Sequence, residues 1–233
     1  MSLSTKTRNG NGRIAELEIQ QPTPEVAAPK REVVTITAPK MRTIPIRIVG
    51  TAPYLQCRFP QKAMLQMMGK QAAGDQNGKR AKRTARDFDA DYQGSMHRIS
   101  DKVYGIPAAA FRAACISACR LVGFKMTIAK LSVFIESDGY DMLDKTPLVI
   151  INGTPEKHTM IGRNDNGGAD IRVRAIYPEW SATVRVTFDE DQFKLVDVVN
   201  LFTRVGAQIG IGEGRPDSKN SAGMGMGTFR IES

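Results

Sequence analysis

The stretch Gly206–Glu232, GAQIGIGEGRPDSKNSAGMGMGTFRIE, stands between a predicted amphipathic helix and a short predicted strand near the C-terminus. Its glycines form two clusters around a polar centre, and they alternate largely with isoleucine and methionine. Glycine allows close backbone approach and conformations that a side chain disfavours. The pattern favours an ordered segment lying against another surface. A flexible hairpin loop is the simpler alternative.

Two common phosphate-binding motifs do not fit this segment. A P-loop carries Lys-Ser/Thr after its last glycine and lies between a strand and a helix. The segment has no such pair in that place, and the predicted strand TFRIE follows it instead of a helix. A Rossmann fingerprint fails for the same reason. The sequence therefore gives only weak support for a nucleotide site.

Alternating β-branched and polar residues predict strands over 32–38 and 42–51, and again in KLSVFIES, PLVII, ADIRVRAIY and WSATVRVTFD. A first helix is predicted in GIPAAAFRAACISACRLVGFK, with Pro107 in its first turn and Gly123 as its stop. A second is predicted in DQFKLVDVVNLFTRVG, with Gly206 as its C-cap. The predicted core residues are Phe111, Ala114, Cys115, Ala118 and Val122 in the first helix, and Phe193, Val196, Val199, Leu201 and Val205 in the second.

Without its insertions, the chain has the order strand, helix, strand, strand, helix, strand. This βαββαβ order predicts an α+β, ferredoxin-like or RRM-like fold, with two helices on one face of an antiparallel sheet. Residues 1–31 are rich in Asn, Gly, Pro and Gln, which predicts a flexible N-terminal arm. Residues 32–233 then form the domain, with a basic insertion at 60–100 and a Gly/Asn-rich hairpin at 152–172.

The glycine segment and the first helix resemble corresponding motifs of the RAMP superfamily, which includes the Cas7-type backbone subunits of CRISPR effectors. Its members have an RRM-like core with a loop of the form G-x-G-x…G-x-G-x-hydrophobic between the second helix and the last strand. The segment Tyr104–Ala118, YGIPAAAFRAACISA, is similar to the family's Y-I-P-G-S-S-x-K-G-A-x-R motif, with Arg112 as the basic residue. The GIGEGRP wording is also similar to that of uncharacterised proteins of tailed phages. The residues similar to the loop are Gly210, Gly212, Gly214, Gly223, Gly225, Gly227 and Phe229.

The sequence departs from the family pattern at two places. Ala108–Ala110 stand where the family has glycine and serine, and Ala222 stands where an arginine precedes the last glycine cluster. Arg215 is the residue that could supply the missing charge. The resemblance implies binding of single-stranded nucleic acid by subunits that assemble side by side along the strand. It also implies that the hairpin at 152–172 corresponds to the family's thumb.

The charge balance also favours a polyanionic ligand. The chain has 33 Lys+Arg against 24 Asp+Glu, a net charge of +9, and such chains commonly meet nucleic acid or anionic membranes. No apolar run approaches about 18 residues, and MSLSTKTRNGNGR lacks the apolar core of a signal peptide. Cys57, Cys115 and Cys119 cannot all pair, which favours the reducing cytoplasm of a prokaryotic cell or phage-infected host.

Basic residues in the insertion and in the hairpin are the predicted phosphate contacts, which would make binding steeply salt-dependent. A solvated helix face, a disordered loop or an ordinary edge strand are the alternatives. Aromatic residues make up only 6% of the chain, although Phe88, Tyr92 and Tyr104 lie near basic residues and could stack on bases. Their scarcity favours binding led by the nucleic-acid backbone. The predicted nucleic-acid-binding residues are Lys79, Arg80, Lys82, Arg83, Arg86, Arg112, Arg163, Arg172, Arg174, Gly210, Gly212, Gly214, Arg215, Gly223, Gly225 and Gly227.

Catalysis has weaker support. The histidines are His97 and His158, and a RAMP-type endoribonuclease would use a histidine near the glycine loop as general acid or base. The helix cysteines form no zinc pattern with either histidine and are predicted to be buried. Aspartates alternate in RDFDADY, at 87, 89 and 91, but EF-hand spacing is absent, and an acidic edge that balances the basic run is the simpler interpretation. No catalytic residue, metal or cofactor is predicted.

These observations predict a non-catalytic, largely sequence-independent protein that binds single-stranded RNA or DNA and assembles as a homo-oligomer or filament. Two alternatives stay open. One is a RAMP-type endoribonuclease that uses His97 or Asp87. The other is a phage structural or assembly protein whose positive charge meets DNA or an acidic partner only loosely.

Overall fold

The strands β3 (Met41–Gly50) and β12 (Ser181–Asp189) form the centre of the main sheet. They are antiparallel and paired over their full length, with Ser181 opposite Val49 and Asp189 opposite Met41. β13 (Phe229–Ile231) pairs antiparallel with the other edge of β3, and β7 (Val133–Ile135) pairs antiparallel with β12. The resulting strand order is β13-β3-β12-β7, with every neighbouring pair antiparallel.

The computed structural model describes residues 7–8, 14–15, 36–72, 74, 85–163, 168–218 and 223–232. The chain divides into two units, Met1–Ala38 and Pro39–Ser233. In the first unit, β1 (Thr7–Arg8) pairs antiparallel with β2 (Ile14–Ala15). The rest of the predicted arm at 1–31 lies outside the described residues.

Further strands extend the second unit. β9 (Pro147–Asn152) pairs with Ser181 and Ala182 at the beginning of β12. It lies on the same edge of β12 as β7, which pairs with the other end of that strand. β6, β5 and β8 continue from β9, while β10, β11 and β4 form a separate three-stranded sheet. The bounds of these strands are β4 Tyr54–Gln56, β5 Arg98–Ser100, β6 Val103–Pro107, β8 Gly139–Tyr140, β10 Glu156–Arg163 and β11 Ala169–Tyr177.

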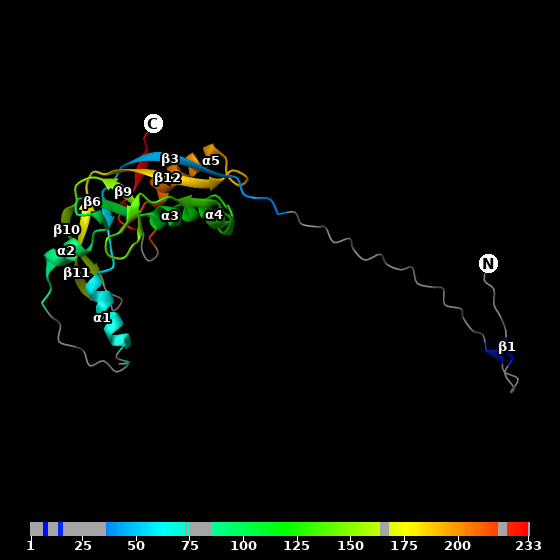
Figure 1. Cartoon of the computed structure of the whole chain (residues 1–233), viewed down its shortest axis with the longest axis horizontal. Helices are drawn as coiled ribbons and strands as arrows, with labels where there is room; N and C mark the ends of the chain where they lie inside the picture. The colour runs from blue at the N-terminus through cyan, green and yellow to red at the C-terminus, as the bar shows by residue number, and fades with distance from the viewer. Residues whose placement is uncertain are drawn as a thin grey trace. The chain divides into compact units, whose positions relative to one another are not determined.

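One hydrophobic core joins the sheet to the helices α3 (Ala108–Leu121) and α5 (Leu195–Arg204). Alternate residues of the central strands enter this core, because side chains of a strand point to opposite faces. Figure 1 shows α3 and α4 (Met126–Ser132) close to β12, while α1 (Gln61–Ala72) and α2 (Phe88–Gly94) lie at the other end of this unit with β10 and β11. The buried residues of the central strands and the two helices are Ile46, Ile48, Ala182, Val184, Val186, Phe188, Ala108, Phe111, Ala114, Cys115, Ala118, Cys119, Val198, Leu201 and Phe202.

The structure confirms the α+β class, with a mostly antiparallel sheet. It also contains strands at the positions predicted for 42–51, PLVII, ADIRVRAIY and WSATVRVTFD. Helices α1 and α2 lie within 60–100, and β10 and β11 form a hairpin over 156–177, which overlaps the predicted hairpin at 152–172. None of the helices within the described residues has the length and apolar character needed to cross a membrane.

Other predictions were wrong in detail. Residues 36–38 are not a strand, and the rest of 32–38 lies outside the description. The strand predicted in KLSVFIES is shorter than expected, since its residues through Ser132 belong to α4 and β7 begins directly after them. In α5 the predicted core residues Val196 and Val199 are exposed, and Val198 and Phe202 are buried in their place. In α3, the predicted core residue Val122 is half-exposed, because it is the C-cap and lies at the surface.

The second helix does not end at Gly206. It continues into a π-helical turn, η1 (Val205–Ile209), which ends at Gly210 with φ +68°. Gly206 is buried inside this turn, where a Cβ atom would overlap the carbonyl oxygen of Phe229. The glycine therefore allows β13 to lie directly against the helix end.

Candidate nucleic-acid interface

The six glycines of the two clusters share one backbone conformation. Their φ angles lie between +66° and +80°, in the left-handed region that L-residues with side chains rarely adopt. This repeated conformation explains why the glycines alternate with other residues. The glycines concerned are Gly210, Gly212, Gly214, Gly223, Gly225 and Gly227.

The two clusters pack against each other. Ile211 N–H donates to the Gly227 carbonyl at 3.0 Å, and Met224 N–H donates to the Gly214 carbonyl at 2.7 Å. A Cβ atom on Gly227 would overlap the carbonyl oxygen of Ile211. The sequence predicted that the glycine segment lies against another surface, and each glycine cluster has the other cluster as that surface. Gly225 differs, because a Cβ there would meet no heavy atom of the described residues within 4 Å.

The segment is also tied to β4 and to the residues before it. Glu213 N–H donates to the Leu55 carbonyl at 2.9 Å, and Gly227 N–H donates to the Pro53 carbonyl at 2.8 Å. A Cβ atom on Gly212 would come within 2.6 Å of the Leu55 carbonyl oxygen. Backbone hydrogen bonds thus hold both clusters in a fixed position on the domain.

A groove of about 160 Å³ lies between the first cluster and α3. Its wall on α3 consists of small side chains, and its opposite wall is the backbone around Gly210 and Gly212. The two motifs that carry the family resemblance therefore meet at one groove. The residues that line it are Ala110, Ala113, Ala114, Ser117, Ile209, Gly210, Ile211, Gly212, Arg215 and Asp217.

Charged residues stand at this groove. Arg215 is half-buried and its Nη1 donates to the Gly212 carbonyl at 3.1 Å. Arg120 Nη2 lies 3.0 Å from Asp217 Oδ1, in an ion pair at the surface. The guanidinium of Arg215 supplies a positive charge beside a wall of backbone and alanine.

The hairpin arginines meet the glycine segment through one carboxylate. Arg174 Nε lies 2.8 Å from Glu213 Oε2, and Arg172 Nη1 lies 3.6 Å from Glu213 Oε1. Both arginines therefore project from one face of β11, as the alternation of its residues predicted. Two guanidinium groups on one carboxylate leave a net positive charge at this junction of hairpin and glycine segment.

The structure does not bring the other predicted basic residues into the groove. Arg86 pairs with Asp91 and Asp170 and donates to the Ile171 carbonyl. Arg112 donates to the carbonyls of Lys130 and Val133, and it is not among the described residues that line the groove. Arg163 ends β10, and nothing is described of its side chain. The cluster Lys79, Arg80, Lys82 and Arg83 lies outside the described residues.

The possible stacking aromatics have other contacts. The Arg86 guanidinium lies over the Phe88 ring, which is 39% exposed, and Arg98 lies over Tyr104. Tyr92 Oη donates to the Pro155 carbonyl at 3.0 Å. Phe88 is the most accessible of the three aromatic rings.

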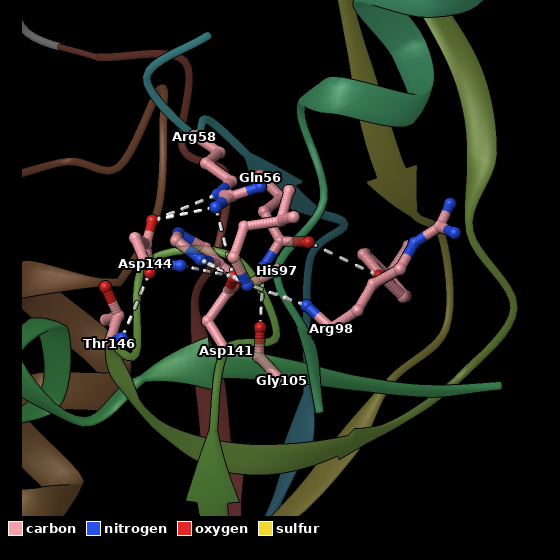
Figure 2. A network of polar contacts seen from close by, with 10 residues as sticks. Gln56, Arg58, His97, Arg98, Gly105, Asp141, Asp144 and Thr146 are labelled. Carbon is pink, nitrogen blue, oxygen red and sulfur yellow. Dashed lines mark hydrogen bonds and ion pairs between the residues drawn. The ribbon is translucent and has the colours of Figure 1, made fainter. Parts of the chain in front are cut away.

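A buried polar cluster, not anticipated from the sequence, lies around Arg58 (Figure 2). Arg58 Nη2 lies 3.0 Å from Asp141 Oδ1 and 2.9 Å from Asp144 Oδ2, and His97 Nδ1 lies 2.9 Å from Asp141 Oδ2. Asp141 also accepts from the backbone N–H groups of Arg98 and Leu143. The cluster joins three segments far apart in the sequence, and no local spacing predicts such a contact.

These contacts bear on the catalytic and metal alternatives. His97, Asp141 and Asp144 have potential ligand atoms within 4.8 Å of one another, but Arg58 donates to both carboxylates and stands where a cation would bind. His97 is itself buried and hydrogen-bonded to Asp141.

The three alternating aspartates of RDFDADY each have a partner within the protein. Asp87 caps α2, Asp89 pairs with Lys157, and Asp91 pairs with Arg86.

The cysteines of α3 are buried and free, as predicted, while Cys57 is exposed. Burial raises the pKa of the Cys115 and Cys119 thiols. Although the residue Cys57 as a whole is exposed, its thiol contacts the side chains of Glu213 and Arg174, and desolvation of the thiol together with the charge of Glu213 raises its pKa. Raised pKa values keep all three thiols protonated and therefore poorly nucleophilic near neutral pH.

The Arg58 cluster predicts loss of stability in acid. Burial lowers the pKa of His97, while hydrogen bonds and the charge of Arg58 outweigh burial and lower the pKa of Asp141 and Asp144. Each group then binds more protons when unfolded, so stability is full above about pH 6.5 and falls as the pH drops below it. Protonation of Asp141 and Asp144 adds a further loss of stability below about pH 4, because the unfolded chain binds these protons more readily than the folded protein. Urea unfolding at neutral and acidic pH measures both losses.

The His97→Gln variant isolates the first loss, because glutamine can still donate to Asp141 but does not titrate. We expect its free energy of unfolding to change less than that of the unmodified protein between pH 7.5 and pH 5.5. Equal changes in the two proteins would contradict a contribution from His97.

Comparison of the chain with protein-family models gave no match, and comparison with curated proteins gave none either.

Proposed function

We propose that this protein is a non-catalytic, largely sequence-independent binder of single-stranded nucleic acid, with a ferredoxin-like core of the RAMP type. The strand order β13-β3-β12-β7 supports this core, because the four strands have the chain order β3, β7, β12, β13. Helix α3 follows the first of them and α5 follows the third, as the βαββαβ order requires.

The groove between α3 and the glycine segment is the observation that carries the proposal. Its wall on α3 carries short side chains and the opposite wall includes the backbone around Gly210 and Gly212, so that a phosphodiester backbone can come close to both. Arg215 at the groove and the Arg172–Arg174 pair beside the same segment supply positive charge. Contacts to phosphate and sugar carry no sequence information, so such binding is largely independent of sequence.

The basic cluster of the insertion, Lys79 to Arg86, adds further phosphate contacts under this proposal. It follows α1 in the chain, and the net charge of +9 is consistent with a polyanionic ligand. Among the six glycines of the two clusters, Gly225 is the one where a Cβ atom would meet no heavy atom of the described residues within 4 Å, and in the proposal it lies at the edge of the bound strand.

Ala113→Glu tests the groove directly. Ala113 is exposed on α3 and lines the groove, so a glutamate there fills it and adds a negative charge without disturbing the core. We expect the affinity for a short labelled oligonucleotide to fall at least about tenfold. Fluorescence anisotropy with single-stranded RNA and single-stranded DNA measures the affinity and identifies the preferred strand.

Ala207→Glu is the matched control, since Ala207 is an exposed residue of η1 that does not line the groove. Its affinity should change by less than the affinity of Ala113→Glu. Equal affinity of both variants and the unmodified protein would refute the groove as the binding site. Cleavage of the RNA during the assay would instead favour the endoribonuclease alternative.

Arg215→Gln gives a second test that separates charge from shape. Glutamine can retain a hydrogen bond to the Gly212 carbonyl but has no charge for a phosphate. The slope of log K against log salt should become shallower by about 0.7, the value for one phosphate contact of a single strand. An unchanged slope would mean that Arg215 contacts no phosphate.

A further inference from the structure

Part of one edge of β3 has no strand beside it. β13 and Glu232 pair with this edge over residues 47–50, and among the described residues no strand pairs with it over 41–45. Residues 41–45 are exposed except Ile44, which is half-buried. A free strand edge of this kind can pair with a strand from another chain.

Hydrogen bonds at the two ends of β3 show which backbone groups point to this free edge. The Lys40 carbonyl accepts from Glu190 N–H at 2.8 Å, so the even-numbered residues of β3 face β12. The odd-numbered residues face the other edge, where the Arg47 carbonyl accepts from Glu232 N–H at 2.9 Å. The groups that point to the free edge are therefore the N–H groups of Met41 and Thr43 and the carbonyls of Met41, Thr43 and Pro45.

Exposed apolar side chains of α5 lie near the same end of β3. β12 ends at Asp189, which is opposite Met41, and α5 begins shortly after it at Leu195. Leu195, Val196 and Val199 are 43%, 58% and 37% exposed. An apolar surface therefore adjoins the free edge.

The two faces of β3 differ along this edge. Ile44 is on the same face as the buried residue Ile46, which packs in the core with the helices. Thr43 is on the opposite face, where its Oγ1 lies 2.7 Å from Thr187 Oγ1. A strand that extends this edge therefore needs apolar residues on the α5 face and small polar residues on the other.

Residues 33–37, VVTIT, have this alternation, with Val34 and Ile36 separated by Thr35 and followed by Thr37. Ile36 is 92% exposed, and residues 36–40 contain neither a strand nor a turn. A hairpin with β3 of the same chain needs a turn between its two strands. The segment therefore suits the free edge of another copy better than the edge of its own.

We propose that residues 33–37 of one copy of this chain add as a strand to the edge at 41–45 in the next copy. Val34 and Ile36 then cover the exposed apolar residues of α5, and the threonines of the segment lie on the same face as Thr43, where cross-strand threonine pairs are favourable. The two contacting surfaces are different, so repetition of the contact produces a ring or an open filament. This contact goes beyond the proposed binding of nucleic acid and does not depend on it.

Substitutions on each surface test the contact in the absence of nucleic acid. Ile36→Asp removes the apolar contact of the segment, and Val196→Asp removes that of α5, where an aspartate in the first turn suits the helix dipole. We expect the unmodified protein, freed of nucleic acid, to sediment as species larger than the 25.6 kDa chain. Each variant alone should sediment at the monomer mass. Val26→Asp, N-terminal to the segment, and Leu131→Asp, at a 76% exposed position of α4, are the matched controls and should assemble like the unmodified protein.

Mixing the two variants distinguishes this contact from one between like surfaces. Ile36→Asp keeps an intact edge and Val196→Asp keeps an intact segment, so an equal mixture should form a dimer and nothing larger. Assembly of Ile36→Asp alone would overturn the proposal. Since no nucleic acid is present, failure of this test leaves the result of the groove experiment unaffected.

Hydrogen exchange, followed residue by residue, identifies the edge itself. The amides of Met41 and Thr43 should exchange at least about tenfold more slowly in the assembled protein than in Ile36→Asp. The amides of Arg42 and Ile44, which face β12, should exchange at the same rate in both. A monomeric unmodified protein would overturn the proposal, and protection of Met41 and Thr43 in that monomer would indicate that the segment pairs with its own β3.

Discussion

Gly227→Ala is expected to lower the free energy of unfolding by at least about 3 kcal/mol, the largest effect of any single methyl group in the glycine segment. Two costs add at this position. The backbone has φ +66°, where an alanine costs about 1–2 kcal/mol, and the new Cβ would overlap the Ile211 carbonyl oxygen. That carbonyl belongs to backbone held by hydrogen bonds, so it cannot move away as a flexible side chain could.

Gly225→Ala is the matched control, two residues away. Its φ is +73°, but the new methyl group would enter open space in the described structure, so only the conformational cost of about 1–2 kcal/mol is expected. Urea unfolding of both variants measures the difference. Equal losses of stability would show that packing between the two clusters contributes nothing.

Arg58→Met is expected to destabilise the protein by about 3–5 kcal/mol, because it leaves a buried carboxylate without its cation. Asp141 is 1% exposed and Arg58 is 6% exposed, so water does not compensate the lost charge. Methionine preserves most of the volume, and the loss therefore reports on charge more than on packing. Unfolding by urea at pH 7.5 measures it.

Arg42→Met serves as the control for removing an arginine from an ion pair. Arg42 and Glu190 form their pair at the surface, with side chains 50% and 42% exposed, where the expected loss is about 0–1 kcal/mol. Adding Asp141→Asn to Arg58→Met should recover part of the stability, since the buried charge is then removed. A loss for Arg58→Met no larger than that for Arg42→Met would contradict the importance of the buried cluster.

Periodic patterns predicted the parts of the fold that depend on local spacing. The alternation in IRVRAIY placed Arg172 and Arg174 on one face of β11, and both now contact Glu213. The apolar stripe of α3 correctly predicted the burial of Phe111 and Cys115. In the second predicted helix the same method was correct for Phe193, Leu201 and Val205 and wrong for Val196 and Val199, because apolar residues occur on both sides of this helix and only packing selects the buried side.

The sequence did not predict which residue each charged side chain would pair with. Arg86 and Arg174 were predicted phosphate contacts, and the structure shows each in an intramolecular ion pair. Such pairs depend on which strands become neighbours. The separation in sequence is 39 residues for Arg174 and Glu213, and 83 residues for Arg58 and Asp141.

The sequence by itself determined that the chain has an α+β domain, that its charge suits a polyanion, and that ordered glycines separate the last helix from the last strand. These properties are local or compositional, and they are set by residue type and spacing along the chain. Only the tertiary structure decided that the two glycine clusters pack on each other, that α3 provides the opposite wall of the groove, and that Arg58 lies buried between two aspartates. Those contacts arise when strand pairing brings distant segments together, because a carbonyl, a carboxylate or a guanidinium then meets a partner that its own sequence neighbours do not specify.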